Sequence, residues 1–188
     1  MEKARTIEQL PERVLVVGCC GAGKSTLAAE LSRRWKLPLI HLDRLWWLPG
    51  WRERDPASFD AELARLLETG RWVIDGNYAR TLPLRLRRAE LVIWLDFSQA
   101  RCLWQVGKRL LRFYGEARPD IAPGCPERLN FEFLRFVWNF RRNARPRLEQ
   151  VLEERPAECR LLVFRTPAEL KFWLERVRIA EDGHEKDS

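Results

Sequence analysis

The stretch GCCGAGKS, at residues 18–25, matches the pattern G-x-x-x-x-G-K-[ST] of a phosphate-binding loop. It follows residues 14–17, a short β-branched run that predicts a buried strand, and it precedes residues 24–35, whose apolar positions have helical spacing. Strand, glycine loop and helix in this order form the context that gives the pattern its meaning. A match by chance in a chain of this length has a probability of about one per cent or less. Residues 14–35 therefore predict a nucleotide-binding site.

The residue types in this loop suit a phosphate ligand. Gly21 and Gly23 let the backbone adopt conformations that a side chain forbids, so that successive N–H groups converge on the β-phosphate. Lys24 brings a cation to the β- and γ-oxygens, and the Ser25 hydroxyl is a ligand for Mg²⁺. Cys19 is expected to fill space, as is Cys20, the alternative being thiols made redox-sensitive by the helix N-terminus. The residues expected to bind ATP are Gly18, Cys20, Gly21, Ala22, Gly23, Lys24, Ser25 and Thr26.

The rest of the chain alternates between apolar runs and helical periodicity. Four more strands are predicted, at residues 37–41, 72–75, 91–96 and 161–164, and four more helices, at residues 55–68, 99–112, 129–153 and 167–179. Such alternation implies a parallel sheet. We expect an α/β fold of the P-loop NTPase type, a three-layer α/β/α domain with a five-stranded parallel sheet in the order 2-3-1-4-5. A small helical acceptor region at residues 43–70 and a helical lid at residues 107–147 complete this prediction.

Length and composition favour a single compact domain. A chain of 188 residues with 46% hydrophobic content fits one core, which we assign to residues 1–180, and the polar residues 181–188 are expected to be a disordered tail. There is no run of about 18 apolar residues and no apolar signal segment, so a cytoplasmic protein without a membrane span is expected. Five scattered cysteines with no zinc-type spacing predict reduced thiols.

The chain is basic, with a net charge of +7 and 34 basic against 27 acidic side chains. A positive balance favours acidic partners, which include nucleotide phosphates, nucleic acid and membrane surfaces. Charge alone does not choose among them, and no motif that reads bases is present. We expect a small-molecule phosphoryl acceptor as the partner, nucleic acid as a possibility, no membrane, and a monomer or homodimer.

Two acidic residues that end predicted strands are candidates for the site, because ligands of doubly wound sheets bind at the carboxyl ends of strands. Asp75 is expected to hold Mg²⁺ together with Ser25, the alternative being an acid that caps the following turn. Asp43 is expected to orient or deprotonate the acceptor hydroxyl, the alternative being a helix cap or a partner of Arg44. Asp96 is interpreted as structural. The predicted catalytic residues are Lys24, Asp43 and Arg109.

Tryptophans and arginines supply the remaining candidates. Trp46, Trp47 and Trp51 lie in one short stretch and either stack on a flat acceptor or form a small hydrophobic cluster. Arginines near the loop can stabilise charge on the transferring group, whereas any single one can instead be a solvated surface residue. Arg109 is expected to contact ATP. The predicted acceptor contacts are Asp43, Trp46, Arg80, Arg141 and Arg145.

Several motifs in the same order resemble those of the adenylate-kinase-related P-loop proteins known as DNA topology modulation proteins, which are similar to adenylate, shikimate and gluconate kinases. The resemblance covers nearly the whole chain and is carried by GCCGAGKSTLA, LPLIHLDRLWWLPGW, WVIDGNYART, RRAELVIWLDF and RPDIAPGCPERLNFEFLRFVW. It implies an acceptor region around Asp43, a lid around residues 109–145, and ATP with Mg²⁺ as the bound ligands.

Two departures from those kinases concern the acceptor. The D-G-F-P-R stretch of adenylate kinases corresponds here to Asp75 through Arg80, in which the arginine is displaced by one position. The Asp-x-Asp of shikimate and gluconate kinases corresponds to His41-Leu42-Asp43, in which one acid is missing. The resemblance therefore does not carry over an acceptor identity.

Two functions follow as hypotheses. The first is an ATP-dependent phosphotransferase that acts on a small nucleotide-like or hydroxylated acceptor. The second is an ATP-dependent regulatory protein that associates with nucleic acid and influences DNA topology. A GTPase is disfavoured because the guanine motif Asn-Lys-x-Asp is absent from the sequence, and the chain is too short for an ABC-type ATPase.

Overall fold

The centre of the molecule is a five-stranded parallel sheet. The computed structural model describes residues 10–184, and side chains are described for residues 10–177. The strands lie in the order β2-β5-β1-β6-β7, which confirms the predicted order 2-3-1-4-5 when the strands of this sheet are counted along the chain. Their bounds are β1 Arg13–Gly18, β2 Leu39–His41, β5 Trp72–Asp75, β6 Leu91–Leu95 and β7 Arg160–Phe164.

The three central strands are buried on both faces. All four residues of β5 and all five of β6 are buried, and so are residues 14–18 of β1. Continuous apolar runs of this kind, without alternation, are typical of parallel strands that are covered by helices on both sides. The sequence runs that predicted these strands therefore also place them in the interior of the sheet.

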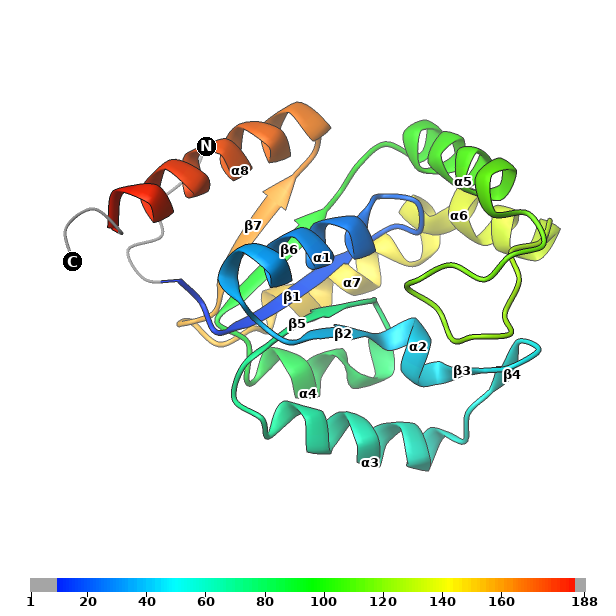
Figure 1. Cartoon of the computed structure of the whole chain (residues 1–188), viewed down its shortest axis with the longest axis horizontal. Helices are drawn as coiled ribbons and strands as arrows, with labels where there is room; N and C mark the ends of the chain where they lie inside the picture. Colours follow the sequence, from blue (N-terminus) through cyan, green and yellow to red (C-terminus); the bar gives the residue numbers. More distant parts are fainter. Residues whose placement is uncertain (1–9, 185–188) are drawn as a thin grey trace.

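Helices cover the sheet from both sides, as Figure 1 shows with α1 in front of the sheet and α7 behind it. On the front side the ring of Trp35 in α1 lies 6.3 Å from that of Trp173 in α8. On the other side α4 packs against α7. The helices are α1 Lys24–Trp35, α2 Leu42–Trp46, α3 Pro56–Leu67, α4 Leu82–Leu86, α5 Gln99–Phe113, α6 Phe131–Asn143, α7 Arg145–Glu153 and α8 Pro167–His184.

The predicted helix at residues 129–153 is two helices. Helix α6 ends at Asn143 and α7 starts at Arg145, with Pro146 in its first turn. A proline lacks the N–H that would continue the first helix and its ring clashes with the preceding turn, so the chain restarts there as a new helix. Helix α8 continues to His184 instead of ending at residue 179. The predicted disordered tail thus has its first four residues in this helix, and residues 185–188 lie outside the described part of the chain.

Several short elements were not predicted. A two-stranded antiparallel hairpin joins β3 (Trp47–Leu48) to β4 (Arg52–Glu53), and a 3₁₀ helix, η1 (Ala79–Thr81), leads into α4. These elements are too short to produce a periodic pattern. They nevertheless position the site, because α2, the hairpin and η1 all follow the carboxyl ends of strands.

The carboxyl ends of β1, β2 and β5 meet at one edge of the sheet. The pairing register places Asp75 of β5 beside Val16 of β1 and beside His41 of β2. The phosphate loop starts at this edge, where β1 ends at Gly18. Within residues 10–184, no helix combines the length and the apolar content needed to cross a membrane.

Candidate functional site

The phosphate loop is packed closely against β6 and α5. A Cβ atom on Gly18 would lie 2.4 Å from the carbonyl oxygen of Leu95, and one on Gly21 would lie 2.3 Å from that of Cys102. Gly23 has a φ of +92° and precedes α1 in the left-handed conformation. Left-handed and adjacent turn conformations turn successive N–H groups to the same side, which makes a concave anion site at the start of a helix. The backbone therefore has the form that the sequence pattern predicts.

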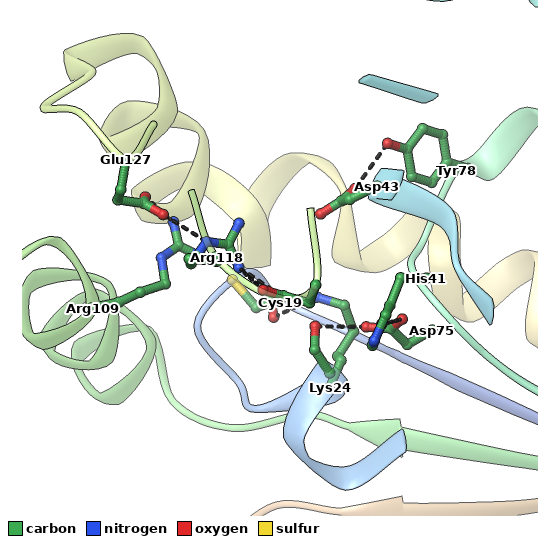
Figure 2. Close-up of polar contacts among 11 residues, drawn as sticks. Cys19, Lys24, His41, Asp43, Asp75, Tyr78, Arg109, Arg118 and Glu127 are labelled. Atoms are coloured by element: carbon green, nitrogen blue, oxygen red, sulfur yellow. Dashed lines mark hydrogen bonds and ion pairs between the residues drawn. The ribbon is translucent and has the colours of Figure 1, made fainter. Parts of the chain in front are cut away.

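Lys24 spans this concavity in the structure. Its Nζ donates a hydrogen bond to the carbonyl oxygen of Cys19 at 3.1 Å, which closes the loop on itself (Figure 2). Thr26, the last residue of the predicted ATP contacts, has an exposed side chain two residues further along. The ammonium group is thus held next to the position where the loop amides converge, and a ligand phosphate would compete with a single carbonyl for it.

The two loop cysteines are held as neutral thiols. Cys19 is buried and hydrogen-bonded to the thiol of Cys102 on α5, which raises the pKa of Cys19. Burial raises the pKa of Cys20, and the opposing charge of Lys24 is not enough to reverse this. A redox-sensitive loop cysteine needs a lowered pKa. The geometry therefore favours the interpretation of both residues as fillers of space.

The carboxylate of Asp75 contacts side chains from two other segments, the phosphate loop and strand β2. The Ser25 hydroxyl donates to its Oδ2 at 2.7 Å, and His41 Nδ1 lies 2.6 Å from its Oδ1 (Figure 2). The side chain of Asp75 is 6% exposed. Burial alone would lower the pKa of His41, but the hydrogen bond and the charge of Asp75 outweigh burial, so the pKa of His41 is raised. The predicted pair Ser25 and Asp75 is brought together, and His41 joins it from the neighbouring strand.

Ser25 and Asp75 offer oxygen ligands that suit Mg²⁺, and a bound nucleotide would supply further ligands. A hydroxyl and a carboxylate are hard oxygen ligands, which Mg²⁺ prefers, and this ion usually keeps several waters and substrate phosphates in its shell. Among the residues that the structure describes, no group of three or more His, Cys, Asp or Glu side chains is placed to hold a metal ion. Ser25 and Asp75 would therefore hold the ion together with phosphate oxygens and water rather than alone.

Asp43 lies in the first turn of α2, directly after β2, and faces the phosphate loop. The Tyr78 hydroxyl donates to its Oδ1 at 2.8 Å (Figure 2). Burial raises the pKa of Asp43, while the Tyr78 hydroxyl and the charges of Lys24 and Arg118 pull the pKa in the other direction. A carboxylate with a raised pKa is more basic than a solvated one, which suits a group that accepts a proton.

The turn after β5 connects these parts through its side chains. Asn77 Oδ1 accepts from the Gly18 N–H at 2.9 Å, and its Nδ2 donates to the Gly18 carbonyl at 2.8 Å, so the amide pairs with both backbone groups of the first loop residue. Tyr78 has a φ of +35°, an uncommon conformation for a residue with a side chain. Asp75, Asn77 and Tyr78 thus bind Ser25, the phosphate loop and Asp43, respectively.

Arg85 stabilises the turn at residues 76–78 through hydrogen bonds to its backbone. It is fully buried, and its guanidinium donates to the carbonyl oxygens of Gly76 at 3.0 Å, of Asn77, and of Tyr78 at 3.0 Å. Burial lowers the pKa of Arg85 to about 9. A buried arginine that satisfies three consecutive carbonyls fixes the backbone of the turn and, through it, the side chains that reach the site.

Replacing Arg85 tests this support. Arg85→Met is expected to lower the free energy of unfolding by about 2 kcal/mol, because buried carbonyls lose their donor while the cost of burying a cation is relieved. Arg87→Met, at an exposed position two residues further on, is the matched control and should change stability by less than about 0.5 kcal/mol. Denaturant unfolding curves measure both. Equal stability of the two variants would contradict the assigned role of Arg85.

The segment between α5 and α6 forms a charged cover over the loop. Arg118 NH1 donates to both carboxylate oxygens of Asp120, at 2.8 and 2.7 Å, and its Nε lies 2.6 Å from Glu127 Oε2. Arg109 NH2 donates to Glu127 Oε1 at 2.8 Å (Figure 2). Burial would raise the pKa of Asp120, but Arg118 and the Ser25 hydroxyl outweigh burial and lower it. The cover therefore reaches the Ser25 side of the loop through Asp120.

An apolar clasp joins this cover to the β3–β4 hairpin. We use this name for the cluster in which Ile121, Ala122 and Cys125 pack against Trp47 and Trp51. Two hydrogen bonds to backbone carbonyls reinforce it, from the Gly50 N–H to Gly124 at 2.8 Å and from Trp51 Nε1 to Pro126 at 2.9 Å. The segment between α5 and α6, in the predicted lid, is thus in contact with the hairpin of the predicted acceptor region.

The tryptophans form hydrophobic clusters. Trp47 and Trp51 belong to the clasp, with ring centroids 5.4 Å apart. Trp46 instead lies against Phe59 at 5.3 Å and Tyr78 at 5.9 Å, on the acceptor side. The cluster that was the alternative to stacking on an acceptor is therefore present, and Trp46 contacts Tyr78, whose hydroxyl binds Asp43.

The other predicted arginines lie in different places. Arg80 pairs with Asp60 of α3 in an exposed ion pair, and Arg141 is exposed on α6. Arg145 binds Asp96 in a bidentate pair with both distances at 2.9 Å. Asp96 is thus a structural partner, as expected. The structure brings together Lys24, Ser25, Asp43, Asp75 and Arg109, and it does not bring these three arginines to them.

Five residues near the site were missed as site residues or left without an assigned role: His41, Asn77, Tyr78, Arg118 and Asp120. Two signals could have indicated some of them. The polar run Asp75 to Tyr78 follows a buried strand at the ligand edge, and His41 is a polar residue at the end of an adjacent strand. Arg118 and Asp120 carry no such signal, because their place depends on how a long loop folds back.

Comparison with solved structures places the fold. The chain superposes on shikimate kinase from Bacteroides thetaiotaomicron with a TM-score of 0.51 at 16% identity, covering 92% of this chain and 99% of that one. For shikimate kinase from Acinetobacter baumannii in complex with shikimate, the TM-score is 0.51 at 15% identity, and the match covers 96% of this chain and 98% of that one. For a candidate kinase from Chloroflexus aurantiacus J-10-fl, the TM-score is 0.52 at 18% identity, and the match covers 93% of this chain and 98% of that one.

Sequence comparisons give no closer relative. No protein-family model matches the chain, and no curated protein matches it. The resemblance to DNA topology modulation proteins therefore stays a prediction. What the structural likeness establishes is the fold: the chain has the architecture of a P-loop kinase.

Proposed function

We propose that this protein is an ATP-dependent phosphotransferase that moves the terminal phosphoryl group of ATP onto a hydroxyl of a small acceptor. The observation that carries the proposal is the position of Asp43, a partly buried carboxylate that faces the phosphate loop and is influenced by the charge of Lys24. A phosphate donor site and a group able to accept the hydroxyl proton thus face each other, as phosphoryl transfer requires. The kinase names of proteins with this fold are consistent with the same chemistry.

On the donor side, the loop amides and Lys24 bind the phosphates. Lys24 leaves the Cys19 carbonyl for the β- and γ-oxygens, where its charge offsets the charge that develops on the transferring group. Bound Mg²⁺, held by Ser25 and Asp75, would neutralise phosphate charge. Arg109 and Arg118 stand on the lid side, and their bonds to Glu127 keep both guanidinium groups in place.

On the acceptor side, Asp43 orients the hydroxyl and accepts its proton. The Tyr78 hydroxyl holds one carboxylate oxygen, which leaves the other for the acceptor. Trp46 and Phe59 pack around Tyr78 and keep its ring in place. The closed lid excludes water from this space, which protects ATP from hydrolysis.

A panel of acceptors tests the proposal. Nucleosides, nucleoside monophosphates and hydroxylated acids are each incubated with ATP and Mg²⁺, and ADP release is measured against the rate without an acceptor. At least one class should raise turnover, and Asp43→Asn should lower that acceptor-dependent rate by about 100-fold while ATP still binds. Acceptor-independent hydrolysis throughout the panel would contradict the proposed transfer.

The pH dependence of turnover gives a second prediction. Asp43 must be ionised to accept a proton, so the rate should fall on the acid side as Asp43 becomes protonated. The Tyr78 hydroxyl stabilises the ionised form and lowers the pKa of Asp43. Tyr78→Phe should therefore move the acid limb of the kcat/KM profile to higher pH. An acid limb that stays in place or moves to lower pH would rule out Asp43 as the group that this limb reports.

A further inference from the structure

The described residues place most of their large exposed apolar side chains on one part of the molecule. Seven of the ten lie between residues 104 and 138, in α5, α6 and the turns that flank them. Leu111 is the most exposed, at 86%, followed by Phe131 at 76%, Tyr114 at 70% and Trp138 at 65%. Single exposed apolar residues need no explanation, but a concentration of this kind marks an interaction surface.

These side chains form two regular stripes. On α5, Trp104, Lys108 and Leu111 follow one another at helical spacing, and on α6, Phe131, Arg135 and Trp138 do the same. Residues three and four apart lie on the same face of a helix. We call these six residues the outer lid face. Apolar and basic side chains alternate along both of its stripes.

The two stripes point away from the body of the protein. Helix α5 buries Cys102 and Val106 and α6 buries Val137 and Phe140, all in the main core. Exposed stripes lie opposite these buried ones. The helices also pack against each other in opposite directions, since Gln99 at the start of α5 donates to the carbonyl oxygen of Trp138 near the end of α6. Figure 1 shows the pair at the upper right of the molecule.

The charge on these helices is strongly one-sided. Helix α5 carries four basic side chains and no acidic one, and α6 carries three basic side chains and a single acid, Glu132. Lys108 Nζ lies 4.4 Å from the centre of the Trp104 ring, so cation and aromatic group are in direct contact. A surface that combines exposed apolar groups with a net positive charge complements a partner that is apolar and anionic at the same time.

We propose that the outer lid face docks on the surface of an anionic lipid bilayer. Aromatic and leucine side chains enter the boundary between headgroups and acyl chains, and the flanking cations bind anionic headgroups. A lysine stem that lies along a tryptophan ring keeps its ammonium group in the headgroup layer while the ring enters. The contact is peripheral and reversible, and it places the lid rather than the opposite end of the domain at the bilayer.

Two other occupants fit the face less well. A second copy of the chain would bring the same cations against one another, with only Glu132 to compensate on each helix pair. Single-stranded nucleic acid uses flat aromatic platforms in a basic groove. Here the most exposed apolar side chain, Leu111, has no ring, and Lys108 already covers one face of Trp104. Hydrocarbon accepts aliphatic and aromatic groups alike.

Vesicle co-sedimentation of the full chain tests the proposal. Vesicles of phosphatidylcholine with about 30% phosphatidylglycerol should bind the protein, pure phosphatidylcholine should bind it weakly, and binding should fall as salt rises above about 0.15 M. Leu111→Asp should lower the partition coefficient at least about tenfold, since it removes an inserting group and adds an anion. Lys108→Gln combined with Arg135→Gln should lower it roughly 25-fold, about fivefold for each cation lost.

Helix α8 offers a matched control. Phe172 is 58% exposed, and the guanidinium of Arg176 lies 5.4 Å from its ring centre, so this pair repeats the Trp104–Lys108 arrangement away from the outer lid face. Phe172→Asp should bind vesicles like the parent protein, and circular dichroism checks that all variants are folded. The proposal is overturned by equal losses for Phe172→Asp and Leu111→Asp, or by no preference for anionic vesicles. Binding of a thymidine oligomer or dimerisation that depends on Trp104, without vesicle binding, overturns it as well.

Discussion

Lys24→Ala is expected to abolish phosphoryl transfer and leave the fold intact. The rate should fall by at least about 10³-fold, because the variant loses the cation that offsets developing charge on the phosphoryl group. The fold should persist because, within the described residues, this side chain donates a single hydrogen bond, to the carbonyl oxygen of Cys19 at 3.1 Å. Initial rates of ADP formation and the midpoint of thermal unfolding measure the two effects separately.

Lys171→Ala is the matched control for Lys24→Ala. Lys171 is 80% exposed in α8 and pairs loosely with Glu175 at 3.9 Å. Loss of this charge should leave turnover within about twofold of the parent protein. Substantial turnover in Lys24→Ala, or an equal loss in both variants, would show that the lysine of the loop does not have the proposed role.

Gly21→Ala is expected to be the most destabilising single change in the loop. The new Cβ would lie 2.3 Å from the Cys102 carbonyl oxygen and 2.9 Å from a Val106 methyl group, and the φ of +81° adds strain for any residue with a side chain. Backbone cannot yield as a flexible side chain does, so α5 and the loop must separate. We expect a loss of about 4 kcal/mol in the free energy of unfolding, above the usual range for overpacking.

Gly23→Ala measures the cost of the strained backbone conformation without a steric clash of the new Cβ atom. Its φ of +92° is similar, but a Cβ at this position meets nothing within 4 Å. This variant should lose only about 1 to 2 kcal/mol, which is the cost of the backbone conformation alone. Denaturant unfolding of both variants gives the difference. If Gly23→Ala were as unstable as Gly21→Ala, close packing of the loop on α5 would not be the cause.

The parts of the fold that the sequence predicted are those with strong local patterns. Residues 14–17, 72–74 and 91–95 are continuous apolar runs, so their burial between two layers of helices follows from composition alone. The loop at residues 18–25 has a fixed spacing that only a few backbone conformations satisfy. Pro146 shows the limit of periodicity, because the apolar spacing continues through it while the helix does not.

The parts of the site that stayed hidden depend on contacts between distant segments. His41 and Asp75 are 34 residues apart and meet because β2 and β5 are neighbours in the sheet. Asn77 reaches Gly18 across 59 residues. Arg80, Arg141 and Arg145 were chosen by type and proximity in the sequence, yet an arginine side chain is long enough to pair with whichever acid the tertiary structure presents. Asp60 and Asp96 are those acids for Arg80 and Arg145.

In the proposed phosphotransferase cycle, the apolar clasp predicts a specific dependence of the rate on temperature. Opening the lid separates Ile121, Ala122 and Cys125 from Trp47 and Trp51, and it exposes apolar surface to water. Exposure of apolar surface raises the heat capacity, so the enthalpy of opening grows with temperature. In the proposed cycle, the predicted lid and acceptor regions would separate together, because one clasp joins them. A cycle limited by this step would show a curved Arrhenius plot, while a cycle limited by chemistry at Asp43 would show a straight one.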